Sequence, residues 1–264
     1  MITNIKNILS KTYYAAEAEA ALSRTSAENK DADRKTISVL VVAAVCLALS
    51  KYLSDPYYLY KFISLFNFTQ LSYQTDSRLL ELGWWVLILF IFYFIVPALL
   101  IKIYLKEKLS GYGLKFKGAF KDHYLYVVML VVMIPLVIFF SGTASFQARY
   151  PFYTIGKFEP LFPHFFEWEL MYLLQFCALE FFFRGFLVHG TKHRFGFYSV
   201  FVMTIPYCMI HFGKPLPETI AAIIAGVILG ILSLKSRSIL LGIAIHYSVA
   251  ITMDLAALWQ KGLL

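Results

Sequence analysis

The sequence contains little charge and few cysteines. Only 15% of its 264 residues are charged, whereas 59% are hydrophobic and 25 are phenylalanine. Soluble domains are about one quarter charged residues, so this composition predicts a polytopic membrane protein. Cys46, Cys177 and Cys208 all fall in apolar runs and have neither a neighbouring cysteine nor paired histidines. We therefore expect no disulfide and no zinc finger.

Two other features are missing as well. Residues 1–35 contain no apolar core followed by a small-residue cleavage site, so they do not resemble a signal peptide. This charged, alanine-rich stretch predicts a surface-lying cytoplasmic helix, or else a partner-binding arm. No internal repeat is visible, which weighs against the duplicated architecture that is common among secondary transporters.

Long apolar runs define the expected fold. Runs of about 20 residues, enough to cross a hydrocarbon layer of ~30 Å, recur after Lys35. They predict an all-α transmembrane bundle of about seven spans, with a short interfacial helix in the aromatic stretch 57–73. Three parts are expected: a cytoplasmic N-terminal arm (1–35), N-terminal transmembrane helices (36–160) and core helices (161–264). The predicted spans are 36–53, 83–105, 124–140, 164–189, 196–212, 219–234 and 238–259.

The net charge of +8 indicates topology rather than nucleic-acid binding. Lys and Arg residues cluster in the short connections between apolar runs, where they mark the cytoplasmic side of a membrane protein. One set of alternate connections holds sixteen of them and the opposite set holds seven. This asymmetry predicts a cytoplasmic N-terminus, and a bacterial inner membrane is the simplest setting.

Residues 177–190, CALEFFFRGFLVHG, place Glu180 and Arg184 one helical turn apart in an apolar helix. Each charge costs roughly 2.5–3.5 kcal/mol at the centre of an inserted helix, so the pair must serve a purpose. One interpretation is a functional site. The other is a structural ion pair that ties this helix to its neighbours.

Further polar groups are expected at the depth of Glu180. His211 lies about as far after the turn near Arg194 as Glu180 lies before it, which places both at the same level. His246 and Asp254 lie two turns apart on the last helix and bracket that depth. We therefore predict that Glu180, Arg184, His211, His246 and Asp254 meet in one buried site. Separately, each histidine could be a packing residue, and Asp254 an interfacial residue near Trp259.

Such a site favours hydrolysis by activated water. Glu180 and His211 together could take a proton from water, while His246 could donate a hydrogen bond to the oxyanion of a tetrahedral intermediate. This division suits peptide hydrolysis without a covalent intermediate. Cys208, three residues before His211, is the alternative nucleophile, but its apolar helix offers nothing that would activate the thiol.

These residues resemble the CAAX-protease and bacteriocin-processing family (CPBP, or Abi), which includes type II CAAX prenyl endopeptidases. The family carries Glu-Glu-x-x-x-Arg, Phe-x-x-x-His and His-x-x-x-Asn on successive core helices. Glu180 and Arg184 match the first motif, Tyr207 and His211 the second with Tyr for Phe, and His246 the third. The resemblance covers about residues 162–258, together with a short element, Tyr112-Gly113-Leu114.

Two positions depart from the family pattern. Leu179 stands at the position of the first Glu, and Ala250 at that of the Asn. The resemblance implies that the first Glu activates water and that the Asn helps to bind the oxyanion. Either Glu180 has assumed the role of base, with Tyr207 and Asp254 as auxiliary groups, or the chain is an inactive pseudoprotease that binds or scaffolds a partner.

The expected activity is that of an intramembrane endopeptidase. Its substrate would be a membrane-anchored or lipid-modified protein or peptide in the lipid bilayer, with no nucleic acid partner. We expect no cofactor. Zinc is the alternative, because two histidines and a carboxylate suit a metalloendopeptidase, although the sequence lacks His-Glu-x-x-His. A small-solute transporter is a third hypothesis and would need a polar path open to both sides.

Overall fold

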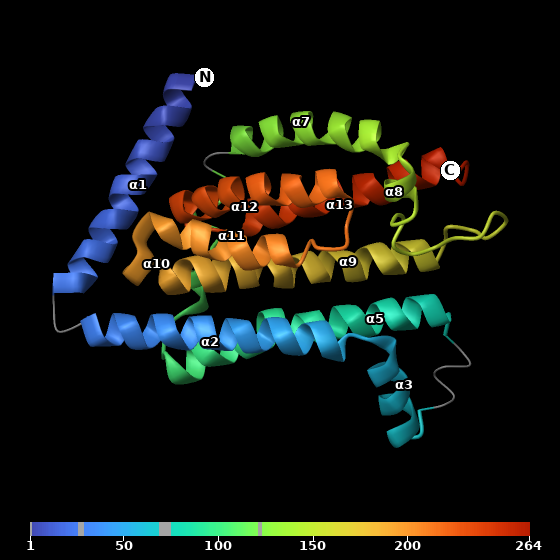
Figure 1. Ribbon diagram of the computed structural model, residues 1–264, viewed down its shortest axis with the longest axis horizontal. Helices are drawn as coiled ribbons and strands as arrows, with labels where there is room; N and C mark the ends of the chain where they lie inside the picture. Colours follow the sequence, from blue (N-terminus) through green and yellow to red (C-terminus); the bar gives the residue numbers. More distant parts are fainter. Residues whose placement is uncertain (1, 26–28, 69–74, 121–122) are drawn as a thin grey trace. The chain divides into compact units, whose positions relative to one another are not determined.

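The computed structural model describes residues 2–25, 29–68, 75–120 and 123–264, and about 80% of the chain is helical with no strand in the described part. The elements run along the chain as labelled in Figure 1. The helices longer than eight residues are α1 (Ile2–Thr25), α2 (Asn29–Leu53), α3 (Pro56–Leu65), α5 (Ser77–Phe90), α7 (His123–Ser141), α9 (His164–Glu180), η4 (Phe181–His189), α11 (Ser199–Met209), α12 (Leu216–Ser236) and α13 (Leu240–Gln260). The shorter ones are η1 (Ile91–Ile95), α6 (Val96–Leu99), η2 (Leu100–Tyr104), η3 (Leu109–Tyr112), α8 (Ala144–Gln147), α10 (Gly190–Phe195) and η5 (Gly196–Tyr198).

Six helices of the described part are long and apolar enough to cross a membrane, which confirms an all-α polytopic fold. One of them, His164–Met209, has 46 residues, or roughly 70 Å at 1.5 Å per residue, more than twice the hydrocarbon thickness. Because η5 separates α10 from α11, and α11 packs against η4, this segment contains two of the seven expected spans. The other five are Asp31–Leu53, Ser77–Tyr104, His123–Ser141, Leu216–Ser236 and Leu240–Gln260.

The short helix expected in the aromatic stretch is α3 (Pro56–Leu65), and its interfacial location stays a prediction. Asp55 caps it by accepting a hydrogen bond from the Tyr57 backbone N at 2.8 Å, and Pro56 occupies its first position. Proline suits the first helical turn because its missing N–H would be unpaired there in any case. The last part of the expected stretch, residues 69–73, lies outside the described residues.

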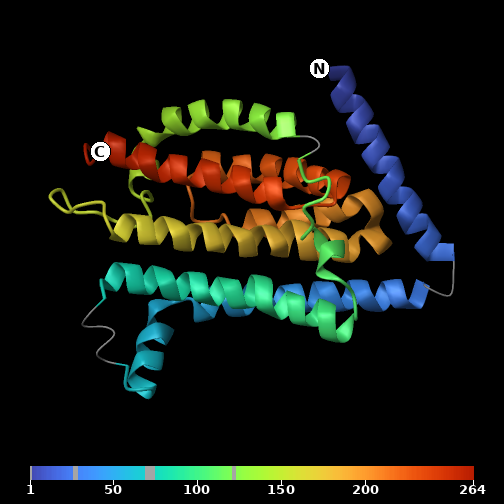
Figure 2. The ribbon, with the colours of Figure 1, turned by 180° about the vertical axis from the view of Figure 1, so that it is seen from behind.

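Two compact units divide the chain. Unit 1 consists of Met1–Val45, Ile95–His123 and Glu180–Gly242. Within it, η4 is completely buried and contacts η3, α10, α11 and α12. Helix α1 packs on α10, η5 and α12, and both ribbon views show it beside the end of the bundle that holds α10 (Figures 1 and 2).

The reversal between α10 and α11 requires a glycine. Gly196 has φ +54°, a left-handed backbone conformation that glycine adopts without a steric cost. A Cβ at this position would collide with the carboxylate of Glu17 on α1, and that carboxylate accepts a hydrogen bond from the Phe197 backbone N at 3.0 Å. The turn at Gly196 therefore packs closely against the N-terminal helix α1.

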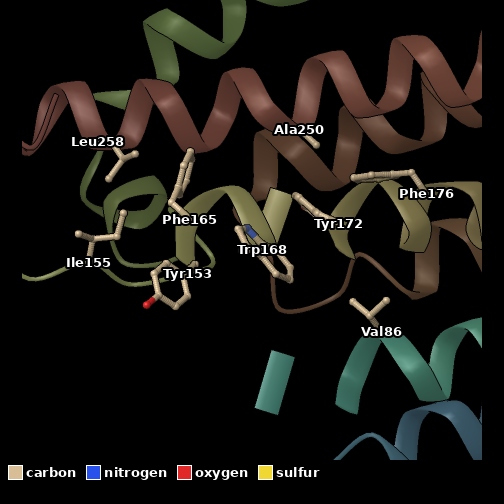
Figure 3. Close-up of a cluster of buried hydrophobic side chains, with 9 residues drawn as sticks. All are labelled: Val86, Tyr153, Ile155, Phe165, Trp168, Tyr172, Phe176, Ala250 and Leu258. Carbon is tan, nitrogen blue, oxygen red and sulfur yellow. The ribbon is translucent and has the colours of Figure 1, made fainter. Parts of the chain in front are cut away.

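Unit 2 consists of Cys46–Phe94, Tyr124–Leu179 and Ile243–Leu264. Its core is largely aromatic. The rings of Trp168, Tyr172 and Phe176 follow one another along α9 with centroid separations of 4.6 Å. Ala250 and Leu258 of α13 belong to the same buried cluster, which Figure 3 shows.

Ion pairs of Arg78 with Asp76 and Glu159, called here the charged tether, hold the loop of unit 2 that precedes α9. Asp76 caps α5 by accepting from the backbone N of Arg78 at 2.8 Å, and its carboxylate also pairs with the Arg78 side chain. The Arg78 guanidinium reaches Glu159 at 2.6 Å and the Thr154 carbonyl at 2.7 Å. Hydrogen bonds from Arg78 hold the pKa of Asp76, and that of Glu159, below their usual range.

This tether predicts a loss of stability in acid. A carboxyl group with a depressed pKa contributes stability above its unfolded pKa, and that contribution disappears as the pH falls through the folded value. At pH values below about 4, we expect the melting temperature of the protein in detergent to decrease. The decrease should be smaller in Arg78→Met, because this variant has already lost the ion pairs of Arg78. Arg149→Met is the control and should follow the wild type. Identical pH profiles for Arg78→Met and the wild type would contradict the assignment.

Candidate functional site

The predicted Glu180–Arg184 pair exists and is completely buried. Arg184 Nη1 donates to Glu180 Oε1 at 2.9 Å, and neither residue has measurable exposure. Glu180 ends α9, and Arg184 lies in the π-helical segment η4. π-Helical turns are rare and occur frequently at functional sites.

Close packing accompanies the π-helical segment. Gly185 lies so near the loop at Tyr112 that an added Cβ would be 2.6 Å from the Tyr112 carbonyl oxygen. Gly113 has φ +87° and accepts a hydrogen bond from the Ile239 backbone N at 3.0 Å. The Tyr112-Gly113 element noted in the sequence therefore lies against the helix that carries Arg184.

Tyr207 and His211 continue the site on the next helix. The Arg184 guanidinium lies 3.9 Å from the centre of the Tyr207 ring, a cation–π contact. The rings of Tyr207 and His211 are 4.8 Å apart. His211 Nδ1 donates to the Tyr207 carbonyl at 2.8 Å, and since a carbonyl only accepts, the neutral imidazole keeps its lone pair on Nε2.

The first turn of α13 approaches Glu180 closely. A Cβ built on Gly242 would be 2.8 Å from Glu180 Oε2, closer than real Cβ contacts allow. Only glycine therefore lets the backbone of α13 approach the carboxylate this closely. In this way unit 1 brings together Glu180, Arg184, Tyr207 and His211 of the predicted site residues, and Gly242 is a contributor that the sequence did not reveal.

Arg184 retains unused donors. Within the described residues, its Nε and Nη2 are buried and have no hydrogen-bond acceptor of normal geometry, although the Tyr207 side chain also interacts with the guanidinium. A buried donor without an acceptor costs free energy, about 1–3 kcal/mol and more for a charged group. The arrangement can therefore accept an additional oxygen atom beside Glu180.

His246 and Asp254 belong to unit 2 and have other contacts there. The His246 ring lies 4.5 Å from that of Phe176. Asp254 is completely buried and accepts from Trp168 Nε1 at 3.0 Å and from the Phe152 backbone N at 3.2 Å. This carboxylate therefore anchors an aromatic core of unit 2, and the role predicted for Asp254 at the site stays a prediction.

A second buried carboxylate was not foreseen. Glu169 of α9 is 5% exposed, and neither of its oxygens has a hydrogen-bond partner of normal geometry in the described part of the chain. Asp254 and Tyr247 are the polar groups that interact electrostatically with the Glu169 carboxyl group. Sequence analysis noticed Glu180 because Arg184 follows at helical spacing, and no such spacing marks Glu169.

The two departures from the family motif are both core positions of unit 2. Leu179 and Ala250 are each about 95% buried, and Ala250 packs in the aromatic cluster of Figure 3. The five-group site draws on both units and stays a prediction. Among the described residues, no three His, Cys, Asp or Glu side chains are grouped to hold a metal ion.

Comparison with known proteins identifies a domain family. Residues 161–252 match the family model described as type II CAAX prenyl endopeptidase Rce1-like. This stretch includes Glu180, Arg184, His211 and His246, and it confirms the resemblance that these residues suggested. No curated protein matches the chain, and no solved structure does.

Proposed function

We propose that this chain, whose residues 161–252 match a family of CAAX prenyl endopeptidases, is an intramembrane endopeptidase that hydrolyses a peptide bond in a membrane-associated protein. The observation that carries the proposal is the completely buried Glu180–Arg184 pair, with Tyr207 and His211 in contact beside it. The matched family consists of proteases, and the six apolar helices make the chain an integral membrane protein.

Glu180 is the proposed base. Its carboxylate takes a proton from water, and the resulting hydroxide attacks the carbonyl carbon of the peptide bond. When the C–N bond breaks, Glu180 returns that proton to the leaving amine, so no covalent intermediate forms. Arg184 Nη1 holds the Glu180 side chain in place through its hydrogen bond, and His211 Nε2 orients the attacking water.

The oxyanion would be held by Arg184. In the family pattern an Asn is expected at position 250, where this chain has Ala250. The Arg184 Nε and Nη2 groups, buried without acceptors of normal geometry in the described part of the chain, supply donors for the oxyanion. Donors already in position stabilise the developing charge better than water does.

The closed state must open for this reaction. Glu180 and Arg184 have no exposure, so water and a peptide reach them only after a local movement. Sites of this kind exclude bulk water, which strengthens the electrostatic interactions inside them. We propose a membrane-anchored or lipid-modified substrate, a cytoplasmic N-terminus and a bacterial inner membrane as the setting.

The proposal is tested with purified protein in detergent and a panel of membrane-tethered peptide reporters. We expect cleavage that is lost in His211→Ala and unaffected by a chelator, because no metal takes part. Cleavage abolished by the chelator and restored by zinc would overturn the metal-independent mechanism.

A pseudoprotease that binds or scaffolds a partner is the second candidate. Two observations favour it, namely Leu179 at the position of the family's base and a Glu180 that is already engaged by Arg184. It predicts that substitutions of Glu180 and His211 change only stability or assembly, and not the rate of a cleavage reaction. Membrane reporters cleaved by the wild type and not by His211→Ala would exclude it.

Gly242 offers a further test of the site. Gly242→Ala is expected to push the Glu180 carboxylate away and to lower cleavage at least tenfold, because overpacking a buried position costs about 1–3 kcal/mol. Gly142→Ala is the control, since its nearest neighbour would be 3.9 Å away, and its rate should stay within about twofold of the wild type. Wild-type cleavage by a folded Gly242→Ala would contradict the placement of Glu180.

A further inference from the structure

Unit 1 contains a polar cavity whose lining does not include Glu180 or Arg184. It has a volume of about 530 Å³ and is lined by four lysines, one glutamate and two histidines, with Ser110, Gly111 and Tyr112 completing the wall. The charged and titratable lining residues are Lys35, Lys106, Glu107, Lys108, Lys192, His189 and His193. The lining is therefore strongly basic.

Two of the lysines are already neutralised by carboxylates. Lys35 Nζ bonds both oxygens of Glu107 at 2.8 and 2.9 Å, and Lys192 Nζ pairs with Glu19 at 3.0 Å. Although burial alone would raise it, the pKa of Glu107 is held below its usual range by hydrogen bonds from Lys35 and Tyr112. Lys106 and Lys108, by contrast, form no ion pair with any of the described residues.

The floor of the cavity is formed by side chains that are almost completely buried. Lys192 is 9% exposed and His189 is 2% exposed. His189 Nε2 is hydrogen bonded to Ser233 Oγ at 3.0 Å, whereas its Nδ1 is buried with no partner in the described part of the chain. Because Ser233 Oγ donates its own hydrogen to the Arg184 carbonyl at 3.3 Å, His189 Nε2 is the donor to Ser233, and the neutral ring has its lone pair on Nδ1. A buried acceptor without a partner is costly, and the hydroxyl of a singly protonated phosphate would satisfy it.

The rim depends on an unusual backbone conformation. Lys106 has φ +56°, a left-handed conformation that is uncommon for residues other than glycine. The Glu107 backbone N then bonds the Ile101 carbonyl at 2.9 Å and ends the helix. This sharp stop places Lys106 and Lys108 at the exposed edge of the cavity.

We propose that this cavity binds a phosphate-bearing ligand. Lysine serves in many proteins as a point charge for phosphate, and the two unpaired lysines give the cavity an excess of positive charge that an anion would neutralise. The cavity lies where candidate spans end, because Lys35 is near the start of Asp31–Leu53 and Lys106 follows Ser77–Tyr104. Basic pockets at that level bind phospholipid headgroups, and a soluble phosphate shares the same chemistry.

The test uses the purified full chain in a neutral detergent at about 0.15 M salt, where diffuse attraction is screened beyond roughly 8 Å. Dioctanoyl phosphatidic acid, dioctanoyl phosphatidylcholine and inorganic phosphate are titrated separately by calorimetry. The double variant Lys106→Gln/Lys108→Gln removes the unpaired charges of the rim. The matched control, Lys115→Gln/Lys117→Gln, removes two exposed lysines of the same connection that do not line the cavity.

We expect saturable binding of about one phosphatidic acid per chain and none of the net-neutral phosphatidylcholine. The rim variant should bind roughly 25-fold more weakly, about fivefold for each lysine removed, and the control within twofold of the wild type. Saturation by inorganic phosphate would identify a soluble ligand, and saturation by phosphatidic acid alone a lipid headgroup. Equal weakening in both double variants, or no saturable binding of either phosphate probe, would overturn the proposal. All four lysines are exposed, so the variants should melt as the wild type does.

Discussion

Glu180→Gln is expected to reduce the rate of peptide cleavage about 1,000-fold, within the range of 10²–10⁴ typical of a general base. The amide keeps the size of the side chain and an oxygen that can accept from Arg184 Nη1, but it cannot take a proton from water. The measurement is the turnover of a membrane-tethered reporter by protein in detergent. Melting curves recorded in parallel should show that the variant is folded.

Glu218→Gln is the matched control for this variant. Glu218 also forms an ion pair at helical spacing, with Lys214 Nζ at 2.7 Å, and the same amide substitution breaks it. Because Lys214 and Glu218 are partly exposed and take no part in the Glu180–Arg184 hydrogen bond, cleavage by Glu218→Gln should stay within about twofold of the wild type. A folded Glu180→Gln that cleaves as fast as the control would remove Glu180 from the mechanism.

Arg184→Met is expected to destabilise the protein by about 3–5 kcal/mol, because it leaves the Glu180 charge buried without its partner. The loss should appear as a lower melting temperature in detergent. Removing both charges in Glu180→Gln/Arg184→Met is expected to recover most of that stability, since an uncharged pair of similar volume has no buried charge to compensate.

The double variant separates the two interpretations of the pair. If Glu180 is the base, the double variant regains stability and remains inactive, so the two properties diverge. A purely structural pair predicts that activity returns together with stability. Recovery of cleavage to within about tenfold of the wild type would therefore contradict the catalytic role.

Much of the fold follows from hydropathy. Apolar runs of about 20 residues must be helical in a membrane, because every backbone polar group needs a partner within its own segment. The helical spacing of Glu180 with Arg184, and of Tyr207 with His211, also brings the side chains of each pair onto one face. Both pairs were therefore predictable, and contacts link them in unit 1.

Other features depend on contacts between distant segments. The π-helical form of η4 accompanies the close approach of Gly185 to the Tyr112 carbonyl, which no local pattern encodes. Asp254 was placed by depth alone, and its partners Trp168 and Phe152 come from α9 and an irregular loop. Similarly, the approach of Gly242 to Glu180 joins residues 62 positions apart, as the numbering shows.

The most direct test compares membrane proteins in host cells that carry either the wild-type chain or Glu180→Gln at equal abundance. Mass spectrometry of the membrane fraction identifies newly formed protein termini, so the natural substrates need not be known in advance. The account predicts a set of cleaved membrane proteins in wild-type cells whose new termini are missing from Glu180→Gln cells. Identical sets of termini in the two strains would contradict the peptidase and favour the scaffold.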